Sequence, residues 1–356
     1  MKAIILCAGK GTRLRPLTHT SAKHLIPLAN KAALEYGIEK IKECGIEDIG
    51  IIIGEETGED ISKEIGDGYR WDVNITYIEQ KEPKGLAHAV KVARQFLQED
   101  SFLMFLGDNL LKNSICPYRK QFEQGHNQAF VLLTHVDNPQ QFGIVVLKNN
   151  KIVRMVEKPE NPPTDLALIG VYFFDKTIHQ AIDQIQPSAR GELEITDAIQ
   201  WLIDHQYIVE TDVIDGWWKD TGKPADIIEA NRLILEDIHR DIHLAMIDDQ
   251  SQVFGRVKLA KGVEIINSKI LGPVVIGENA RIENSYIGPF TSLSDRVEVK
   301  DSEIEYSVIM ADTKIADVRR RMQKCLLGKN VKIYRSDEMP RIHEFILGDD
   351  SQLRLM

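Results

Sequence analysis

The feature that most constrains the fold is an apolar residue that returns every five to seven positions in the C-terminal third of the chain. The repeat consists of Val257, Val263, Ile270, Ile276, Ile282, Ile287, Leu293, Val299, Ile304, Ile309 and Ile315. Such an imperfect hexapeptide repeat is typical of a left-handed parallel β-helix, in which each coil buries apolar corners against its neighbours. An ordinary antiparallel β domain is the alternative. We predict a left-handed β-helix domain with a C-terminal tail over residues 241–356.

Residues 1–240 show a different pattern, in which short apolar runs alternate with helical periodicity. The runs have the length and the continuous apolar character of buried parallel strands, and they occupy residues 3–6, 49–53, 75–78 and 102–106. Alternating strands and helices indicate an α/β domain with a mostly parallel, Rossmann-like sheet and helices on both of its faces.

Helical segments lie between these runs. Leu34, Ile38 and Ile41 fall on one face of a helix that Gly45 ends, and a second apolar face recurs through residues 86–97. A further helix over 225–243, opened by Pro224, is expected to join the two domains.

The composition limits the partners that the chain can have. Its 54 Asp and Glu residues outnumber its 44 Lys and Arg residues, which gives a formal net charge of −10. An acidic chain lacks the basic surface that general nucleic-acid binding requires. No stretch approaches the roughly 20 apolar residues that span a bilayer, and the N-terminal apolar run is too short for a signal peptide. We expect a cytoplasmic protein with no nucleic-acid or membrane partner.

The four cysteines, Cys7, Cys44, Cys116 and Cys325, lie far apart in the sequence and form no CxxC pair. That spacing indicates neither a zinc site nor a disulfide framework, and it is typical of a reducing compartment. Cys7 is interpreted as a small buried apolar residue at the end of a strand.

A glycine-rich turn, "LCAGKGTRLRPLT" at residues 6–18, directly follows the first apolar run. It is not a Walker A loop, because Gly11 stands after Lys10 where Ser or Thr is required. It is not the dinucleotide-binding fingerprint, because Arg13 and Leu14 interrupt the glycine spacing. What remains is a G-x-G-T-R turn whose backbone N–H groups and Arg13 can hold phosphate oxygens, with Lys23 following in "SAKHLIP".

This turn is the first of a series of motifs that occur in a recognisable order. The series continues with "AKHLIP", "QKEPKGLAHA", "LGDN", "FGIV", "VEKP", "GVYFFD", "RGELEITD" and "WWKDTG". In this order the motifs resemble those of sugar-1-phosphate nucleotidylyltransferases, above all the long form of the glucose-1-phosphate thymidylyltransferase family, which carries a β-helix tail. The resemblance covers essentially the whole chain. It departs from the family at Ala8, where Gly is frequent, and at His24, where the short forms have Gln.

The resemblance implies that glucose 1-phosphate attacks the α-phosphorus of dTTP, forming dTDP-glucose and releasing pyrophosphate. The attacking oxygen is already an anion, so positioning and charge neutralisation take the place of a general base. Among the residues it implies as catalytic, Arg13 takes the departing phosphates and Lys23 stabilises charge on the α-phosphate. The implied nucleotide contacts are Leu6, Ala8, Gly9, Gly11, Thr12, Arg13, Gln80, Pro83 and Gly85.

Asp108 in "LGDN" and Asp220 in "WWKDTG" have two possible roles. Each stands at the end of an apolar segment, where a carboxylate is either a helix cap or a metal ligand. The resemblance implies that both bind one Mg²⁺ that bridges triphosphate oxygens, and that both are catalytic. Trp218 and its neighbour Trp217 are interpreted as packing beneath the Asp220 strand.

The segment "EQKEPKGLA" is implied to read the base. A side-chain amide such as that of Gln80 can pair with a pyrimidine edge, and Gly85 permits a close backbone approach. The alternatives are a solvated strand end for Gln80 and an ordinary helix-start glycine for Gly85.

The resemblance assigns sugar-phosphate contacts to Gly143, Glu157, Lys158, Tyr172 and Arg190. A surface ion pair is the alternative for Glu157 and Lys158. Glu192 and Glu194 in "GELEITD" are interpreted as helix-capping and dipole-compensating residues.

Several functions remain open at this point. UTP or ATP can replace dTTP, a non-catalytic sugar-nucleotide sensor can use the same fold, and a β-helix can also transfer acetyl groups. Intact Arg13, Lys23, Asp108 and Asp220 argue against a sensor. An acetyl-transfer site usually needs a His base, and His343 is the only His after residue 250. The implied product enters deoxysugar and polysaccharide synthesis. Because β-helices present flat faces, we expect a homo-oligomer, with a trimer favoured and the tetramer of shorter relatives as the alternative.

Overall fold

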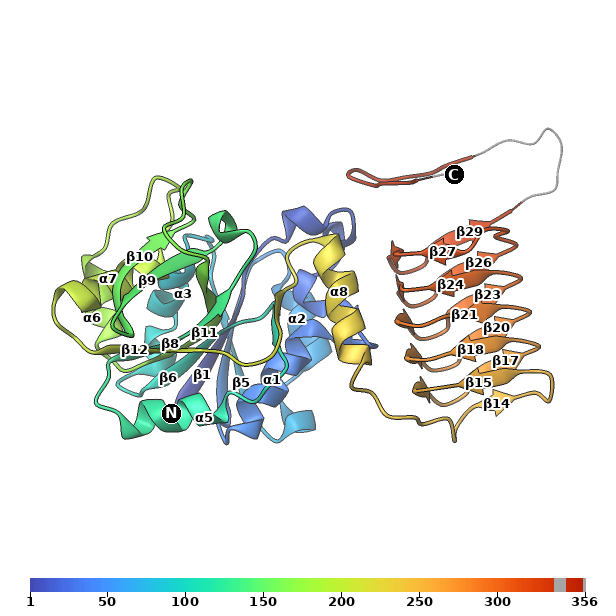
Figure 1. Cartoon of the computed structure of the whole chain (residues 1–356), viewed down its shortest axis with the longest axis horizontal. Helices are drawn as coiled ribbons and strands as arrows, with labels where there is room; N and C mark the ends of the chain where they lie inside the picture. The colour runs from blue at the N-terminus through green and yellow to red at the C-terminus, as the bar shows by residue number, and fades with distance from the viewer. Residues whose placement is uncertain (336–343, 355–356) are drawn as a thin grey trace. The chain divides into compact units, whose positions relative to one another are not determined.

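The computed structural model describes residues 1–335 and 344–354 (Figure 1). His343 and its "MPRI" neighbours lie outside the described residues. The chain forms two compact units: the first comprises Met1–Lys10 and Ala33–Asp220, and the second comprises Gly11–Ala32 and Thr221–Met356. The functional division into 1–240 and 241–356 stays a prediction.

The first unit is built around a nine-stranded sheet. Its parallel half has the strand order β6 (Phe102–Leu106), β1 (Lys2–Cys7), β4 (Asp48–Ile53), β5 (Asn74–Glu79). These four strands contain the four apolar runs that the sequence predicts as strands. The other strands of the unit are β7 (Asn109–Leu111), β8 (Ala129–His135), β9 (Gly143–Lys148), β10 (Lys151–Glu157), β11 (Leu166–Phe174), β12 (Val209–Val213) and β13 (Trp218–Asp220).

The rest of the sheet is mixed, so the expectation of a mostly parallel sheet holds for one half only. Strand β11 runs antiparallel to β6, β8 and β9. Strands β9 and β10 are joined by the two residues Asn149 and Asn150, and a connection that short permits only antiparallel pairing.

Helices cover both faces of this sheet, as predicted. The helices of the unit are α1 (Ala33–Glu43), α2 (Gly58–Ile65), α3 (Leu86–Val92), α4 (Arg94–Leu97), α5 (Cys116–Gln124), α6 (Ile178–Gln184) and α7 (Ile195–Asp204), with short 3-10 turns η4 (Tyr69–Trp71) and η5 (Pro139–Gln141). A Cβ on Gly37 of α1 would lie 3.1 Å from the ring of Phe105 in β6. Phe102 and Met104 of the same strand share an apolar cluster with α3, α6 and α7. Side chains alternate along a strand, so these contacts lie on opposite faces.

Cys44 and Cys116 form a disulfide, which corrects the expectation from the cysteine spacing. Their Cα atoms lie 4.9 Å apart although the residues are separated by 72 positions. Cys44 follows α1 and Cys116 begins α5, so only the folded chain brings the two together. Cys7 is fully buried in β1, as predicted.

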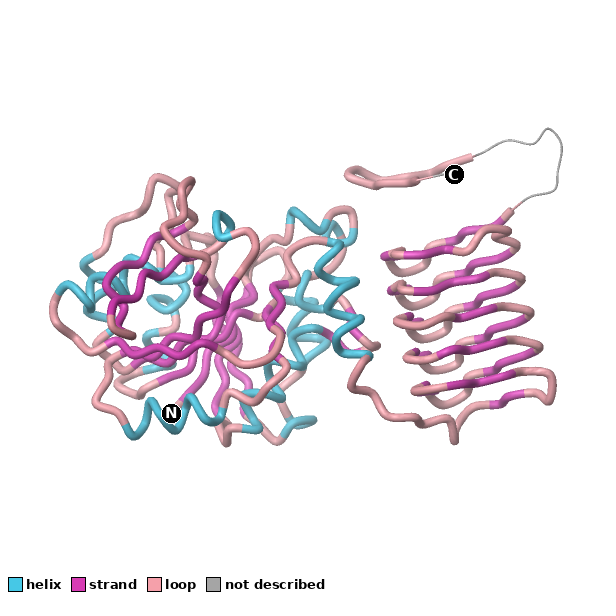
Figure 2. The backbone as a smooth tube through the Cα atoms, in the orientation of Figure 1, coloured by secondary structure: helices cyan, strands magenta, loops and turns pink. Residues whose placement is uncertain are grey.

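The second unit contains the predicted parallel β-helix, whose short strands are stacked coil upon coil in Figure 2. Three parallel sheets of six, five and five strands run along it. Their strands are, in the first sheet, β14 (Met246–Ile247), β17 (Glu264–Ile266), β20 (Arg281–Glu283), β23 (Glu298–Lys300), β26 (Lys314–Ala316) and β29 (Lys332–Tyr334); in the second, β15 (Gln252–Phe254), β18 (Lys269–Leu271), β21 (Tyr286–Ile287), β24 (Glu303–Glu305) and β27 (Met322–Gln323); and in the third, β16 (Val257–Leu259), β19 (Val274–Ile276), β22 (Thr291–Leu293), β25 (Val308–Ile309) and β28 (Leu326–Leu327).

Every coil adds one strand to each of the three sheets, because each strand pairs in parallel with the strand three places later. All the apolar residues of the hexapeptide repeat lie in one buried cluster inside the coils. The parallel pairing rules out the antiparallel alternative.

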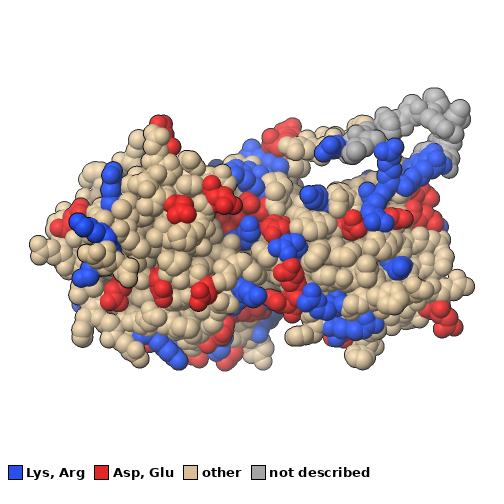
Figure 3. Space-filling model, in the orientation of Figure 1, with Lys and Arg blue, Asp and Glu red and all other residues tan. Residues whose placement is uncertain are grey.

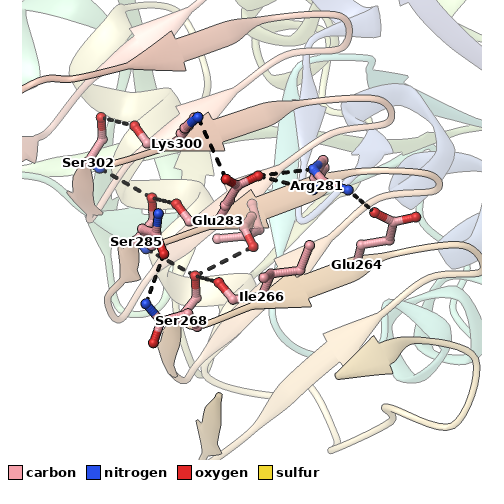
Figure 4. A network of polar contacts seen from close by, with 11 residues as sticks. Glu264, Ile266, Ser268, Arg281, Glu283, Ser285, Lys300 and Ser302 are labelled. Atoms are coloured by element: carbon pink, nitrogen blue, oxygen red, sulfur yellow. Dashed lines mark hydrogen bonds and ion pairs between the residues drawn. The ribbon is translucent and has the colours of Figure 1, made fainter. Parts of the chain in front are cut away.

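A ladder of serines connects successive coils (Figure 4). Its members Ser251, Ser268, Ser285 and Ser302 recur every 17 residues, and the N–H of each later serine donates to the Oγ of the one before at 3.0–3.2 Å. The hydroxyls of the last three donate to the carbonyl two residues earlier. Ser268, Ser285 and Ser302 are buried at the corners of the coils, where hydrogen bonds from their side chains replace those with water.

The outward side of the first β-helix sheet carries ion pairs. Arg281 bridges Glu264 and Glu283, and Lys300 approaches Glu283 at 3.6 Å (Figure 4). On the face drawn in Figure 3, basic side chains lie among acidic ones over both units. Within the described ranges, no helix is long and apolar enough to cross a membrane.

Helix α8 (Pro224–Leu235) starts at the predicted proline but ends at Leu235, not at residue 243. The chain then turns toward the first coil, where Asp241 forms a bridge with Lys258 and its N–H donates to the Val257 carbonyl at 2.9 Å. The remaining elements of this unit precede α8 in sequence: η1 (Thr12–Leu14), η2 (Leu17–His19), η3 (Lys23–Leu25), β2 (Pro27–Leu28) and β3 (Lys31–Ala32).

Candidate active site

Strand β1 delivers the start of the glycine-rich turn at its carboxyl end. Leu6 is buried in the strand, Ala8 is half-buried and Gly9 is exposed. Lys10 extends outward, and its Nζ pairs with Glu56 Oε1 at 2.7 Å. Two exposed partners in water gain little from such a pair, so it is a weak restraint on Lys10.

Ala8, Gln80 and Pro83 line one pocket of about 100 Å³, together with residues of the loop between β4 and α2. Gly54 of that loop approaches the turn closely, because a Cβ there would lie 3.2 Å from the Ala8 carbonyl oxygen. The structure thus brings three of the predicted nucleotide-binding residues together. It adds Gly54, whose only sequence signal is its position after a strand.

A larger pocket of about 540 Å³ lies elsewhere in the first unit. Met1, Ser101 and Asp175 are among the residues that line it. Met1 and Ser101 precede β1 and β6, so this pocket lies at the opposite end of the strands from the turn. It contains none of the predicted site residues.

Gln80 is buried, which rules out the solvated strand end. It is 5% exposed, and its Nε2 lies 2.8 Å from His88 Nδ1 and 3.4 Å from the Gly85 carbonyl oxygen. Burial, and then Lys84, lower the pKa of His88 and favour the neutral ring, whose Nδ1 can accept from the amide. His88 lies in the first turn of α3, which begins at Leu86. No sequence motif pointed to His88 as a partner of Gln80.

Position 85 must be glycine because the backbone at Leu193 lies directly against it. Its φ is +99°, and a Cβ there would lie 2.4 Å from the Leu193 carbonyl oxygen. Two backbone hydrogen bonds flank this approach, from Leu193 to Lys84 at 2.8 Å and from Ala87 to Leu193 at 3.1 Å. The predicted base-reading segment is therefore tied to the loop that carries Arg190.

Asp108 lies directly before β7, and Asp220 ends β13. Strand β13 pairs antiparallel with β7, and the pairing sets Asp220 opposite Asn109, the residue after Asp108. Asn109 Nδ2 donates to Asp108 Oδ1 at 3.0 Å. Asn109 is held in turn, because its Oδ1 accepts from the Gly170 N–H at 3.0 Å and from Trp218 Nε1 at 2.6 Å.

The helix-cap alternative is wrong for both aspartates. Strand β7, not a helix, follows Asp108, and α8 has Lys223 at its N-cap position. Two carboxylates at the ends of one strand pair fit a Mg²⁺ ion, which takes one or two protein carboxylates and completes its shell with phosphate oxygens and water. Among the described residues there is no cluster of three or more His, Cys, Asp or Glu that would form an all-protein metal cage.

The predicted sugar-phosphate residues gather around Glu157. Gly143 pairs with Glu157 across β9 and β10, and a Cβ on Gly143 would lie 3.2 Å from Glu157 Oε2. Lys158 and Arg190 approach Glu157 Oε1 at 3.3 Å and 3.2 Å. The hydroxyl of Thr196, which the sequence analysis did not assign to the site, lies 3.4 Å from Glu157 Oε2.

Tyr172 lies in β11, the strand that pairs with β9. It is 4% exposed and stacks on Phe174 with ring centroids 5.9 Å apart. Burial, and then Glu157, raise the pKa of its phenol. Tyr172 is thus a buried neutral side chain whose charge environment includes Glu157.

Glu194 does not cap α7 with its side chain, although it occupies the N-cap position. Its Oε1 accepts from Ser188 Oγ at 2.8 Å and lies 3.4 Å from Arg190. Glu192 also pairs with Arg190, at 3.2 Å. The capping interpretation is wrong because Arg190 and Ser188 compete for these carboxylates. Burial raises the pKa of Glu194.

The second unit carries the rest of the glycine-rich turn. Gly11 has a φ of +63°, and a Cβ there would lie 3.1 Å from the Lys23 Cβ. Thr18 Oγ1 donates to the Gly11 carbonyl at 2.8 Å. Thr12 and Arg13, in η1, are exposed. Lys23 therefore lies beside the turn, as predicted.

The sequence of this chain matches known proteins along its whole length. The family model described as nucleotidyl transferase matches residues 2–237. A glucose-1-phosphate thymidylyltransferase of Streptomyces antibioticus is 46% identical over 100% of this chain and 99% of that protein. The low-salt glycan biosynthesis nucleotidyltransferase Agl11 of Haloferax volcanii is 44% identical, over 100% of both chains.

A solved structure is similar to about two thirds of this chain. It is a Bacillus anthracis protein described as a glucose-1-phosphate thymidylyltransferase, in complex with a sucrose. It is 36% identical, has a TM-score of 0.64, and covers 68% of this chain and 97% of its own.

Proposed function

The chain belongs to the nucleotidyl transferase family, and we propose that it transfers the thymidylyl group of dTTP to glucose 1-phosphate. The products are dTDP-glucose and pyrophosphate. The observation that carries this proposal is the 46% identity to a glucose-1-phosphate thymidylyltransferase over the full chain, β-helix included.

In the transfer, an oxygen of the sugar phosphate forms a bond to the α-phosphorus as the bond from that phosphorus to the pyrophosphate oxygen breaks. The nucleophile is an anion, so no residue needs to remove a proton from it. Gly9, Gly11 and Thr12 bind the triphosphate, Arg13 binds the departing phosphates, and Lys23 offsets charge on the α-phosphate.

Asp108 and Asp220 are the proposed Mg²⁺ ligands. A bound Mg²⁺ neutralises charge on the triphosphate oxygens. Asn109 orients the Asp108 carboxylate for this task, since it donates to one of its oxygens and is itself held by Trp218 and Gly170.

Gln80, Pro83 and Gly85 form the proposed base site, and Leu6 and Ala8 complete it. His88 holds the Gln80 amide nitrogen, which leaves the amide oxygen to accept the N–H of a pyrimidine base. Thymine and uracil share that edge, so UTP is the competing substrate.

Glu157 is the proposed centre of the sugar site. Its carboxylate accepts sugar hydroxyls, while Lys158 and Arg190 bind the sugar phosphate. Gly143 lets Thr196 and Glu157 pack against its backbone, because a Cβ there would lie 2.8 Å from Thr196 Cγ2. Tyr172 is buried in β11, which pairs with β9.

The product is proposed to enter deoxysugar and glycan synthesis in the cytoplasm. A left-handed β-helix and a trimer remain part of the proposal. The charged outer side of the first β-helix sheet argues that a trimer contact would use another face, because burying exposed ion pairs costs their hydration.

One assay tests the proposal. Purified protein, Mg²⁺ and glucose 1-phosphate are incubated with each nucleoside triphosphate in turn, and pyrophosphate release is measured. We expect the highest kcat/KM with dTTP. A higher kcat/KM with UTP or ATP would overturn the base assignment, and no release with any triphosphate would point to a sensor.

A further inference from the structure

The segment that carries Lys23 ends in a hairpin with a strained turn. Strands β2 and β3 pair antiparallel, and the two residues between them, Ala29 and Asn30, have φ angles of 46° and 64°. Both lie in the left-handed region, which Asn tolerates but which strains an L-residue with an ordinary side chain such as Ala. Such a conformation persists where surrounding contacts hold it.

Those contacts come from the β-helix and from α8. The Ala29 N–H donates to Asn231 Oδ1 at 2.8 Å. Asn30 Nδ2 donates to the Leu293 carbonyl at 2.6 Å, and Ser294 Oγ lies 3.3 Å from Asn30 Oδ1. Leu293 is the last residue of β22, so the hairpin turn is fastened to one coil.

Asn231 is the centre of this anchor. It is fully buried in α8, and its Oδ1 also accepts from Ser292 Oγ at 2.7 Å. Its Nδ2 donates to the Phe290 carbonyl at 3.3 Å. A buried amide with its oxygen shared between the hairpin and the coil fixes the position of one against the other.

The glycine-rich turn is packed on the same segment. Gly11 lies against the side chain of Lys23, and Thr18 holds the Gly11 carbonyl. Leu17 reaches another coil, since a Cβ on Gly328 would lie 3.2 Å from its Cδ2. Residues 11–32 thus take their position from the β-helix. In agreement, Gly11–Ala32 belongs to the same compact unit as the β-helix.

We infer that the β-helix is a positioning element of the transfer reaction, acting through Asn231 and Asn30 on the segment that holds Arg13 and Lys23. The kinetic consequence of this inference rests on the proposed function. The hydrogen bonds that Asn30 and Asn231 make with the coil do not depend on it. Displacing a phosphate-binding cation by about 1 Å can lower the rate by about 10²-fold.

The variant Asn30→Gly tests the inference in the full chain. Glycine keeps the left-handed turn and removes the two side-chain contacts to the coil. We expect kcat/KM for dTTP to fall by about 10–100-fold, the KM for glucose 1-phosphate to stay within about twofold, and the melting temperature to change little. A matched control is Asn150→Gly, because Asn150 has a φ of 59° in the exposed turn between β9 and β10.

A second measurement needs no catalysis. Trypsin can cleave after Arg13 and Lys23 in this segment, whereas Pro16 blocks cleavage after Arg15. We expect faster cleavage after Arg13 and Lys23 in Asn30→Gly than in the wild type or in Asn150→Gly. Ser292→Ala removes one donor to Asn231. It should lower kcat/KM for dTTP and speed tryptic cleavage, each by less than Asn30→Gly does.

The two readouts separate the two proposals. Faster cleavage in a protein that shows no dTTP transfer in the wild type supports the anchor and overturns the proposed function. Unchanged cleavage and unchanged kinetics in Asn30→Gly and Ser292→Ala overturn the inference while leaving the proposed function standing.

Discussion

Trp218 donates its indole N–H to Asn109 Oδ1 at 2.6 Å, and the Asn109 amide donates to Asp108 Oδ1 at 3.0 Å. Asn109 is 2% exposed, so this chain of hydrogen bonds is sheltered from water and fixes one orientation of the amide. The direction in which Asp108 presents its carboxylate therefore depends on a tryptophan two positions before Asp220.

Trp218→Phe should raise the Mg²⁺ concentration for half-maximal turnover by several-fold. The variant keeps the aromatic contact with Phe142 but removes one hydrogen bond, worth about 1 kcal/mol. Turnover is measured against Mg²⁺ concentration, with Trp71→Phe as the control in a 3-10 turn of the same unit. An unchanged Mg²⁺ dependence would show that Asn109 holds its orientation without Trp218.

Asp108→Asn and Asp220→Asn should each lower turnover by about 10²–10³-fold and leave the melting temperature nearly unchanged. The change is almost isosteric and removes one charge from the proposed ion site. The double variant should be little worse than either single one, because both residues act through one ion. Melting temperature and Mg²⁺-dependent turnover are measured on all three, and retained turnover in either single variant would remove that aspartate from the site.

Gln80→Ala should raise the KM for dTTP by an amount corresponding to roughly 1–3 kcal/mol, because a base edge loses its partner. The KM for glucose 1-phosphate should change much less. Since Gln80 is buried and bonded to His88, the melting temperature should also fall. Equal losses for the two substrates would indicate that Gln80 only supports the loop.

Glu194→Gln should stabilise the protein increasingly as the pH rises from about 4 to 7. Burial raises the pKa of Glu194, so the folded state keeps a proton that the unfolded chain has lost. The wild type therefore has this stability below the usual carboxyl pKa of about 4.3 and loses it as the pH rises through the raised value.

The check is the difference in melting temperature between Glu194→Gln and wild type across that pH range. Glu192→Gln is the matched control, since Glu192 pairs with the same Arg190 but its side chain is 35% exposed, against 5% for Glu194. A difference that stays constant with pH would show that Glu194 titrates alike in both states.

Reduction should destabilise the protein through the Cys44–Cys116 bond. A cross-link between residues 72 positions apart typically contributes about 2–4 kcal/mol. The unreduced, denatured protein should show two thiols, from Cys7 and Cys325, and four after reduction. Cys44→Ser should match the reduced wild type in melting temperature, with Cys325→Ser as the control. Four thiols before reduction would contradict the bond.

Sequence reasoning succeeded where a feature repeats locally. The four parallel strands β1, β4, β5 and β6 were predictable because they contain largely apolar runs, and the β-helix because Val257 to Ile315 recur at near-constant steps. The end of α8 was not predictable, because helical periodicity continues past Leu235 while tertiary pairing of Asp241 draws the chain into the first coil.

In the candidate site, too, local motifs predicted some residues while others are recognised only in the folded chain. Motifs located Asp108, Asp220, Glu157 and Gln80, but not their supports. Asn109 stands inside the quoted "LGDN" motif, yet its role depends on Trp218 and Gly170, which are distant in sequence. The disulfide and the contact of Gly85 with Leu193 are likewise made only by the folded chain.

The serine ladder has a consequence for how this part of the gene can change in length. Ser251, Ser268, Ser285 and Ser302 each receive or supply a bond at a spacing of 17 residues. A deletion or duplication of 17 residues within this stretch returns every serine to the level of a neighbour and shortens or lengthens the solenoid by one whole coil. A change that is not a whole multiple of 17 residues leaves a buried hydroxyl facing the wrong backbone group, so tail lengths that evolve here should differ in whole coils.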